Sequence, residues 1–329
     1  MAQAPFIINP ALVAIANDYA GINRTARGYI ADRVAPRMPV DAPLFRYPQY
    51  AIEDAFTVYD NQVDRLGRLN EITSSATETA GETRDYGILE KVPYRDEAAA
   101  RNQSLPFPLK ARAVRHVIDV NQLNREIRVA GMTMNPATYL PAYVDDRGAG
   151  IKWDDYENPL SDPVRDVAKA RLGALVRPNV GVTNEYVMDA LSRHPKLAVA
   201  LGGQPNSGRI LSTEEIARAL KLDRIEIGST IKQTSRRGQT LVTGSIWPNS
   251  LALHYQGPLN AQGEGLDNGG TNFLATFQWG GIVSGENPYR PGEMGLYGGV
   301  GVYTGESLVE KRVAPFSGFL FTSVLTDEV

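Results

Sequence analysis

The chain has 329 residues, 43% of them hydrophobic and 22% charged, with a formal net charge of −3, so one large core or two smaller ones can form. The near-neutral charge argues against a dedicated nucleic-acid-binding protein, which would carry a strong basic excess. The absence of cysteine excludes disulfides, thiolate metal sites and cysteine nucleophiles, and no apolar run is long enough to span a bilayer. Residues 1–6 lack the basic segment of a secretory signal, so we expect a soluble protein made in the cytoplasm.

Residues 1–48 are predicted to form an extended N-terminal arm. Four prolines between positions 36 and 48 fix φ and remove backbone donors, so neither a helix nor a central strand can continue there. Apolar residues such as Phe6 and Ile7 are unusual in a freely solvated tail. We therefore expect the arm to lie on a protein surface, with a disordered tail as the alternative.

Residues 49–103 are predicted to form a long projecting hairpin. Strand-favouring stretches at 56–59 and 86–94 flank a polar stretch at 70–85 that is rich in Thr, Ser and Glu. An isolated hairpin is only marginally stable in water, so this one is expected to pack on another surface. A disordered insertion is the alternative.

The clearest predicted helix covers residues 108–131, within a segment bounded at 104 and 134. Its apolar residues recur every three or four positions and predict one buried stripe; they are Val114, Val117, Ile118, Leu123, Ile127 and Ala130. Gly131 and Pro136 are predicted to end the helix.

The polar face of this helix is predominantly basic, with Lys110, Arg112, Arg115, Arg125 and Arg128. The hairpin is predominantly acidic; its charged residues include Glu78, Glu82, Asp85, Arg84 and Lys91. We expect the two surfaces to match between copies of the chain, although a solvated charged face on each is the alternative.

The middle of the chain predicts a compact α/β unit. Asp162 caps a helix over 163–176 with an apolar stripe that includes Leu172 and Leu175, and Asn184 caps a second helix over 185–192. Ser212 and Glu215 have capping-box spacing before a third helix, and residues 224–227 alternate as a strand. Further strands are predicted at 251–255, 277–279, 300–303, 309–313 and 319–325, separated by glycine-rich turns.

No common catalytic or cofactor-binding motif occurs in the sequence, and we expect no cofactor or metal. His116, His194 and His254 are far apart and are interpreted as structural residues, with His194 at a helix end near terminal carbonyls. Arg236 and Arg237 form a basic turn that could line a pore or contact phosphate, although a solvated loop is the simpler interpretation.

The order of these parts resembles the Hong Kong 97-type major capsid proteins of tailed bacteriophages. The segment 112–130 resembles the spine helix of one branch of that family, and Trp153, 158–162, 190–197, 211–217 and 222–228 follow in the expected order. The resemblance implies an α+β capsid fold made of an N-arm (1–48), an E-loop hairpin (49–103) and a spine helix (104–134). It also implies a P-domain at 135–178, with returning strands from about 297 to 329, and an A-domain at 179–296.

The resemblance also implies that the chain is not an enzyme. Copies would form pentamers and hexamers that close an icosahedral shell around phage double-stranded DNA, which they contact non-specifically. Scaffolding, portal and decoration proteins would be partners, no membrane would be involved, and the shell would be assembled in the host cytoplasm and end up in the virion. The E-loop would lie over a neighbouring subunit and the N-arm would strap another, so we expect deletion of residues 70–90 to abolish assembly while leaving the core folded. The expected inter-subunit contacts are Phe6, Ile7, Glu78, Glu82, Arg84, Asp85, Lys91, Lys110, Arg112, Arg115, Arg125, Arg128, Arg236 and Arg237.

Three alternatives stay open at the level of sequence. An encapsulin-like compartment would share the fold and enclose cargo enzymes in place of DNA. A hydrolase acting through two carboxylates would need a pair held at a fixed separation, and no pair stands out. A β-rich adhesin would account for the glycine-rich C-terminal third, but the long amphipathic helix argues against it.

Overall fold

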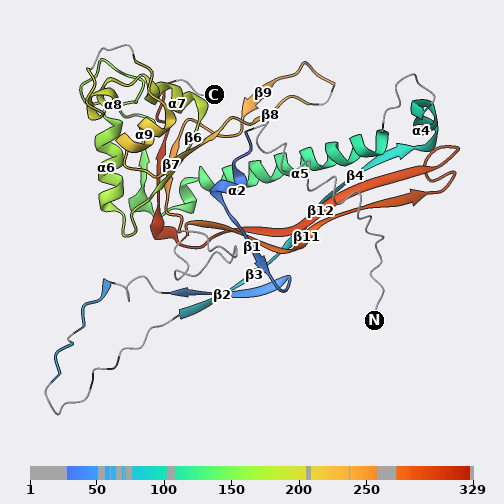
Figure 1. The fold of residues 1–329 in the computed structure, drawn as a ribbon, viewed down its shortest axis with the longest axis horizontal. Coiled ribbons are helices and arrows are strands. Elements are labelled where there is room, and N and C mark those ends of the chain that lie inside the picture. Colours follow the sequence, from blue (N-terminus) through green and yellow to red (C-terminus); the bar gives the residue numbers. More distant parts are fainter. Residues whose placement is uncertain are drawn as a thin grey trace.

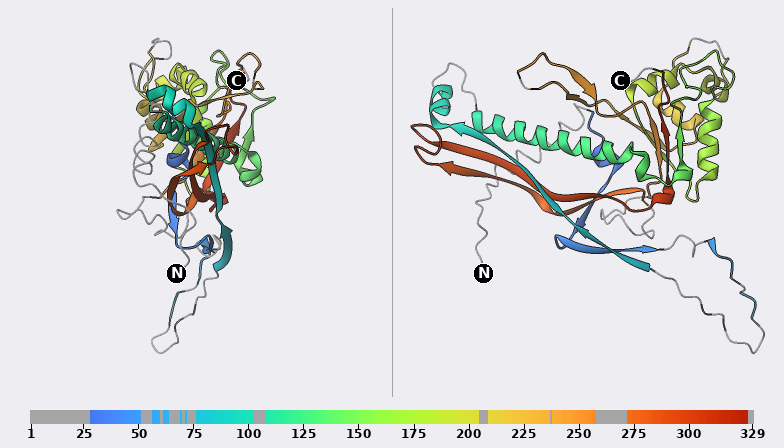
Figure 2. Two further views of the ribbon diagram at one scale, coloured as in Figure 1. Left: turned by 90° about the vertical axis from the view of Figure 1, so that its right-hand side faces the viewer. Right: turned by 180° about the vertical axis from the view of Figure 1, so that it is seen from behind.

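A computed structural model describes residues 28–50, 56–59, 61–63, 69, 71, 76–101, 108–204, 209–236, 238–257 and 272–326. The molecule has three visible parts (Figure 1). A compact unit with several short helices lies at one end, a long helix and sheet extend away from it, and a two-stranded hairpin projects from the underside. Views from the side and from behind show the same separation (Figure 2).

The extended part is built on the helix α5 (Leu109–Thr133), which lies along a four-stranded sheet. The sheet has the order β1 (Arg37–Val40), β11 (Leu274–Tyr289), β12 (Gly299–Arg312) and β4 (Arg84–Pro93). Buried residues of α5 contact the sheet and form a narrow core with it; they include Val114, Ile118, Val92, Val300 and Val302. The long helix predicted here and its apolar stripe are thereby confirmed.

The predicted end of this helix was wrong by two residues. α5 continues through Gly131 to Thr133, and Met134 then donates its backbone N–H to the carbonyl of Ala130. A single glycine costs a helix only about 1 kcal/mol relative to alanine, which the buried neighbours Val129 and Ala130 offset.

The compact unit has a five-stranded sheet, and four helices pack with it. The strand order is β5 (Val144–Asp146), β13 (Gly318–Thr322), β10 (Leu251–His254), β6 (Val180–Asn184) and β7 (Arg224–Gly228). The helices are α6 (Pro163–Gly173), α7 (Glu185–Ser192), α8 (Pro195–Ala200) and α9 (Thr213–Ala219). Their shared core contains the fully buried side chains of Trp153, Leu191, Leu197, Ile216 and Leu253.

The predicted helix caps are confirmed. The side chains of Asp162 and Asn184 accept backbone N–H groups of α6 and α7, and Ser212 with Glu215 forms a complete capping box at α9. The buried stripe predicted for 163–176 was too long, because α6 ends at Gly173, and Leu172 and Leu175 are exposed. His194 was expected near the carbonyls of a helix end. Instead its side chain accepts the N–H of Lys196 and caps the start of α8.

The later predicted strands are present, but the one predicted at 319–325 ends at Thr322 in β13 (Gly318–Thr322). Stretches 300–303 and 309–313 belong almost entirely to the single strand β12, which pairs with β11 over most of its length. The remaining short elements are α4 (Tyr94–Arg101), η1 (Pro136–Thr138), η2 (Pro141–Tyr143), η3 (Pro315–Ser317), β8 (Ile231–Gln233) and β9 (Thr243–Ser245). The boundaries of the five predicted parts of the family fold stay a prediction. β11, which that division put with residues 179–296, pairs with the sheet along α5.

Much of the predicted arm belongs to the core of its own subunit. Ile30, just before α2 (Ala31–Val34), and Val34, at its end, are fully buried. β1 pairs in parallel with β11. Burial of these two apolar side chains favours packing over the extended arm expected for this segment. Residues 1–27 lie outside the described residues, so the strapping role predicted for Phe6 and Ile7 stays a prediction.

The hairpin is present with different strands from those predicted. Its strands are β2 (Leu44–Tyr50) and β3 (Ala76–Glu82), paired from Leu44 with Glu82 to Tyr50 with Ala76. The predicted strand at 56–59 was wrong, since residues 57–59 are not in a strand. The stretch 86–94 does form a strand, but this strand is β4 and it pairs with β12 of the same chain.

Candidate assembly surfaces

The projecting hairpin is fixed at its base and exposes several large apolar side chains. Phe45 and Tyr47 of β2 contact Phe277 of β11, with ring centroids 4.6 and 5.2 Å apart. Leu44, at the base of the hairpin, is 72% exposed, and Val58, which follows β2 in the chain, is 95% exposed. A hairpin that is anchored at its base and exposes apolar side chains to solvent has the character of a protein–protein contact surface.

The charged hairpin residues named from the sequence remain on the surface. Glu78 pairs with Arg46 across the hairpin at 3.0 Å, and both side chains are exposed. Glu82, Arg84, Asp85 and Lys91 are also exposed, and the Lys91 ammonium lies 5.2 Å from the centre of the Tyr289 ring. Exposed pairs of this kind contribute little to the stability of the subunit, so these charges stay available to a partner.

Carboxylates of the same chain pair with Lys110, Arg125 and Arg128 of α5. Lys110 lies 3.1 Å from Glu286, and Arg128 lies 3.0 Å from Glu310. Arg125 is buried against Asp32, which overturns its assignment as an inter-subunit contact. β11, β12 and residue 32 thus supply negative charge to these three residues within the chain. The match expected between the acidic hairpin and this face of another copy stays a prediction. Arg112 and Arg115 are exposed.

Sequence reasoning missed the buried carboxylate of Glu126. Its oxygens accept hydrogen bonds from the backbone N–H groups of Ile30 and Ala31, at 3.0 and 2.9 Å, and from the indole N–H of Trp247 at 2.9 Å. Burial raises the pKa of Glu126, and these three hydrogen bonds oppose that rise. Glu126 thus holds residues 30–31 on α5. Its place in a charged run of helix residues gave no signal of this role.

Each of the three histidines contacts side chains or backbone groups of its own chain. His254 is fully buried, and burial lowers its pKa to about 3. Because the Tyr139 hydroxyl donates to the carbonyl of Thr133 at 2.6 Å, it accepts from the Nε2–H of His254 at 2.8 Å. His194 is also buried, with a pKa lowered to about 4 mainly by burial, whereas the exposed His116 pairs with Glu90. Within the described ranges, no group of three or more acidic or histidine residues could hold a metal ion.

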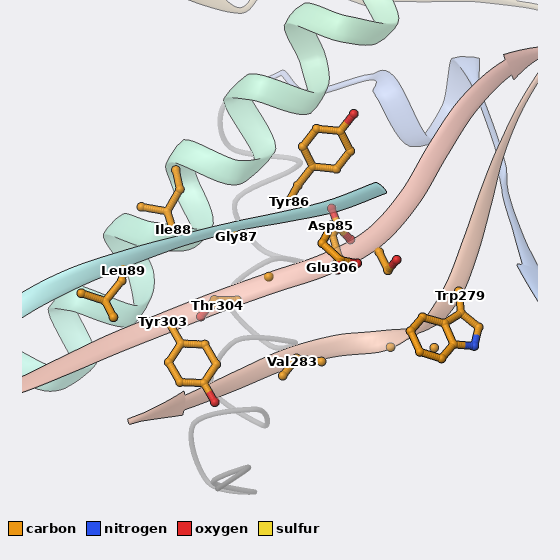
Figure 3. Close-up of a pocket in the computed structure, with 14 residues that line it drawn as sticks. Asp85, Tyr86, Gly87, Ile88, Leu89, Trp279, Val283, Tyr303, Thr304 and Glu306 are labelled. Carbon is orange, nitrogen blue, oxygen red and sulfur yellow. The ribbon is translucent and has the colours of Figure 1, made fainter. Parts of the chain in front are cut away.

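An open apolar groove of about 610 Å³ crosses the sheet on the side opposite α5 (Figure 3). Tyr86 and Ile88 lie on the α5 side, where Arg128 stacks 3.8 Å from the centre of the Tyr86 ring. Successive side chains of a strand alternate between faces, so Leu89 and, on β12, Tyr303 line the opposite side. The groove is completed by residues of all three long strands; they include Trp279, Gly280, Gly281, Val283, Gly87, Gly305 and Asp85.

The basic turn between β8 and β9 is only partly described. Arg236 is exposed, and Arg237 lies outside the described residues. Ile231 and Leu241 beside this turn are exposed as well. The turn is therefore a mixed basic and apolar surface.

The sequence has close relatives among phage shell proteins. It is 31% identical over 325 residues to the major capsid protein of Pseudomonas phage JBD67, covering 99% of both chains. The chain belongs to the bacteriophage major capsid proteins. A second member, the major capsid protein of Burkholderia phage BcepMu, is 23% identical over 265 residues, covering 78% of this chain and 79% of the relative. No protein-family model matches this capsid protein.

Solved structures agree on the fold. A phage-related protein from Bordetella bronchiseptica RB50 superposes with a TM-score of 0.69 at 18% identity, covering 99% of both chains. The capsid of cyanophage P-SCSP1u gives a TM-score of 0.52 at 10% identity, covering 88% of this chain and 86% of that one. The capsid protein therefore has the Hong Kong 97-type fold and is a shell-forming component of a virion. An encapsulin from Synechococcus elongatus PCC 7942 shares the fold with a TM-score of 0.50 at 12% identity, covering 92% of each chain. The fold therefore does not separate a phage capsid protein from an encapsulin-like compartment, whereas the sequence similarity to phage capsid proteins favours the capsid.

Within the described ranges, none of the helices combines the length and the apolar character needed to cross a membrane.

Proposed function

We propose that copies of this capsid protein assemble as pentamers and hexamers into an icosahedral shell that encloses phage double-stranded DNA. Assembly takes place in the host cytoplasm, with scaffolding, portal and decoration proteins as partners. The protein has no catalytic role. The observation that carries this proposal is the projecting hairpin, whose base is fixed on the subunit while its apolar residues face solvent.

A surface of this kind is stable only when another molecule covers it. Burying an exposed Val or Leu side chain contributes about 1.5–3 kcal/mol, and the hairpin presents several. A neighbouring copy is the partner that a shell supplies at every position. The surface charges of the hairpin and of α5 are further proposed contacts; they are Glu78, Glu82, Arg84, Asp85, Lys91, Arg112 and Arg115.

Non-specific contact with DNA fits the weak charge of the chain. A net charge of −3 gives no general attraction to phosphate, so any contact is local. Arg236 is the exposed basic residue that we propose for such a contact, together with its neighbour Arg237 in the sequence.

The first test is deletion of the hairpin end. The 70–90 deletion expected from the sequence is too large, because it would remove most of β4 from the sheet along α5. Tyr50 and Ala76 are directly paired, so an Asn-Gly turn in place of residues 51–75 would close β2 onto β3. We expect electron microscopy to show shells for the full chain and none for the shortened one, with unchanged thermal unfolding of the subunit.

The matched control replaces residues 51–75 by a Gly/Ser linker of equal length, which keeps the chain length and removes the side chains. Shell assembly by either variant would contradict the role of the hairpin. A full chain that stays a 36 kDa monomer at high concentration would contradict the function itself.

A further inference from the structure

The sheet groove has a floor of glycine between two rows of larger side chains (Figure 3). Gly87 of β4 and Gly305 of β12 are paired in register, so this row carries no side chain on these two strands. The residues two positions away along the strands face the same side and form the walls; they are Asp85, Ser307 and Trp279 in one row and Leu89 and Tyr303 in the other. Asp85 and Leu89 are four positions apart, so about 13 Å separate the walls at the backbone. A side chain of another molecule can lie flat on this floor.

Packing within the subunit requires only one of the two floor glycines. A Cβ atom on Gly305 would lie 2.8 Å from the carbonyl oxygen of Tyr86, which is too close. A Cβ atom on Gly87 would have its nearest neighbours at 3.6 Å, an ordinary van der Waals distance. A larger residue at position 87 would therefore fit the subunit and fill the groove, so the room above Gly87 is not a by-product of strand packing.

Elsewhere on the same face, the subunit places a cation on an aromatic ring by itself. Lys91 is paired with Gly301 of β12, and its ammonium lies 5.2 Å from the centre of the Tyr289 ring. The Tyr289 ring covers Gly301, since a Cβ atom there would meet it at 2.8 Å. Beside Gly305, the ring is the indole of Trp279, which is 42% exposed. Within the described part of the chain, no cation lies over this ring.

Charge complementarity favours an arginine as the missing cation. Asp85 is exposed in the same row as Trp279, and no basic side chain is among the lining residues. Glu306, the other acidic lining residue, is already paired with Arg37 at 2.6 Å. A planar guanidinium stacks on an indole ring and pairs with a carboxylate through several donors. Polyanions such as DNA are repelled by Asp85, so the fitting partner is a basic protein segment.

The chain has little sequence of this kind to offer outside its described parts. Residues 1–17 carry no charged side chain, and residues 258–271 carry two acidic ones and no basic one. Residues 51–75 carry five acidic and two basic side chains, so Asp85 would repel them. Residues 18–27, with two arginines and one aspartate, are the exception and are included in the test below. The composition of these segments favours a second protein as the source of the arginine.

Resting on the proposed shell function, we propose that the groove docks an accessory protein of the shell. The docked segment places an arginine on Trp279 beside Asp85, and an adjacent large apolar side chain packs against Leu89 and Tyr303.

Tryptophan fluorescence of the full chain measures this docking with a defined probe. The chain has three tryptophans, and Trp153 and Trp247 are fully buried, so Trp279 reports on a ligand in the groove. The probe is the peptide acetyl-Gly-Phe-Arg-Val-Gly-amide, and its matched control carries neutral citrulline in place of arginine. We expect the arginine peptide to shift the emission saturably to shorter wavelength. The citrulline peptide should bind at least about tenfold more weakly, because it lacks the charged hydrogen bonds to Asp85.

Two variants separate the charge from the space. Asp85→Asn should weaken the arginine peptide about tenfold and leave the citrulline peptide unchanged, a difference that misfolding would not produce. Gly87→Leu should abolish binding of both peptides with unchanged thermal unfolding, because position 87 has room for a side chain. Glu157→Gln, which removes an exposed carboxylate of the compact unit, is the control and should bind like the wild type.

Equal binding of the two peptides, or unchanged binding by Asp85→Asn and Gly87→Leu, would overturn the proposal. Assembled particles should bind the arginine peptide as the free subunit does. Loss of binding on assembly would assign the groove to a neighbouring copy, and tighter binding of a peptide of residues 18–27 would assign it to the chain itself; either result rejects an accessory protein. Particles that form and bind no peptide would leave the shell function intact, whereas peptide binding by a chain that forms no particles would reject the shell function and the accessory role with it.

Discussion

The compact unit and the projecting hairpin use apolar residues in opposite ways. In the compact unit, Trp153 and Leu253 are fully buried among helices and strands of the same chain, and polar groups at the helix ends are capped locally. In the hairpin, Leu44 and Val58 face solvent, while Phe45 and Tyr47 contact Phe277 of the sheet along α5. The first region is complete within one subunit, while the second completes its burial only on another molecule. Substitutions in the two regions should therefore separate stability from assembly.

The largest effect on stability is expected for Glu126→Ala. This change leaves the N–H groups of Ile30, Ala31 and Trp247 buried without their acceptor, which costs about 3 kcal/mol or more. Urea unfolding of the unassembled subunit measures the loss. Glu126→Gln is the matched variant, because it keeps one acceptor oxygen and should lose less. Equal stability of Glu126→Ala and the wild type, within 0.5 kcal/mol or so, would show that the carboxylate does not hold residues 30–31.

A smaller effect is expected on lowering the pH. The folded chain keeps His254 neutral, with a pKa of about 3, whereas an unfolded histidine has a pKa near 6.5. Between these values the unfolded state binds more protons, so stability rises with pH and is lost as the pH falls below about 6.5. From pH 7 to 4.5 the loss should be about 2–3 kcal/mol for His254, with a loss in the same direction from His194.

Urea unfolding midpoints measured across this pH range test whether stability falls with falling pH and whether His254 causes the fall. His254→Phe should flatten the dependence of stability on pH. An equal slope in the wild type and in this variant would rule out His254 as the cause.

The smallest effect on stability is expected in the hairpin. Val58→Ser should change the free energy of unfolding by less than about 0.5 kcal/mol, because the side chain already faces solvent. The same change should slow or reduce shell formation in light scattering. A large loss of stability without a loss of assembly would reverse the contrast between the two regions.

The sequence predicted contacts between residues that are close in the chain, but not contacts between residues that are far apart in it. Asn184 and the Ser212–Glu215 box make contacts across three positions, so spacing alone predicted them. Glu126 contacts Ile30 across 96 positions, and Arg125 faces Asp32 across 93, so each looked like an ordinary surface charge of a helix. The groove was missed for a related reason. Its floor joins glycines of different strands, and only strand pairing brings Gly87 opposite Gly305.

The segment that begins at Gly28 connects the five-stranded sheet of the compact unit to the four-stranded sheet along α5. Arg33 pairs with Glu226 of the compact sheet at 2.7 Å, while Arg37 pairs with Glu306 of the long one. A segment that is ion-paired to both sheets resists rotation of one sheet relative to the other. Each subunit therefore enters a lattice at nearly fixed internal angle.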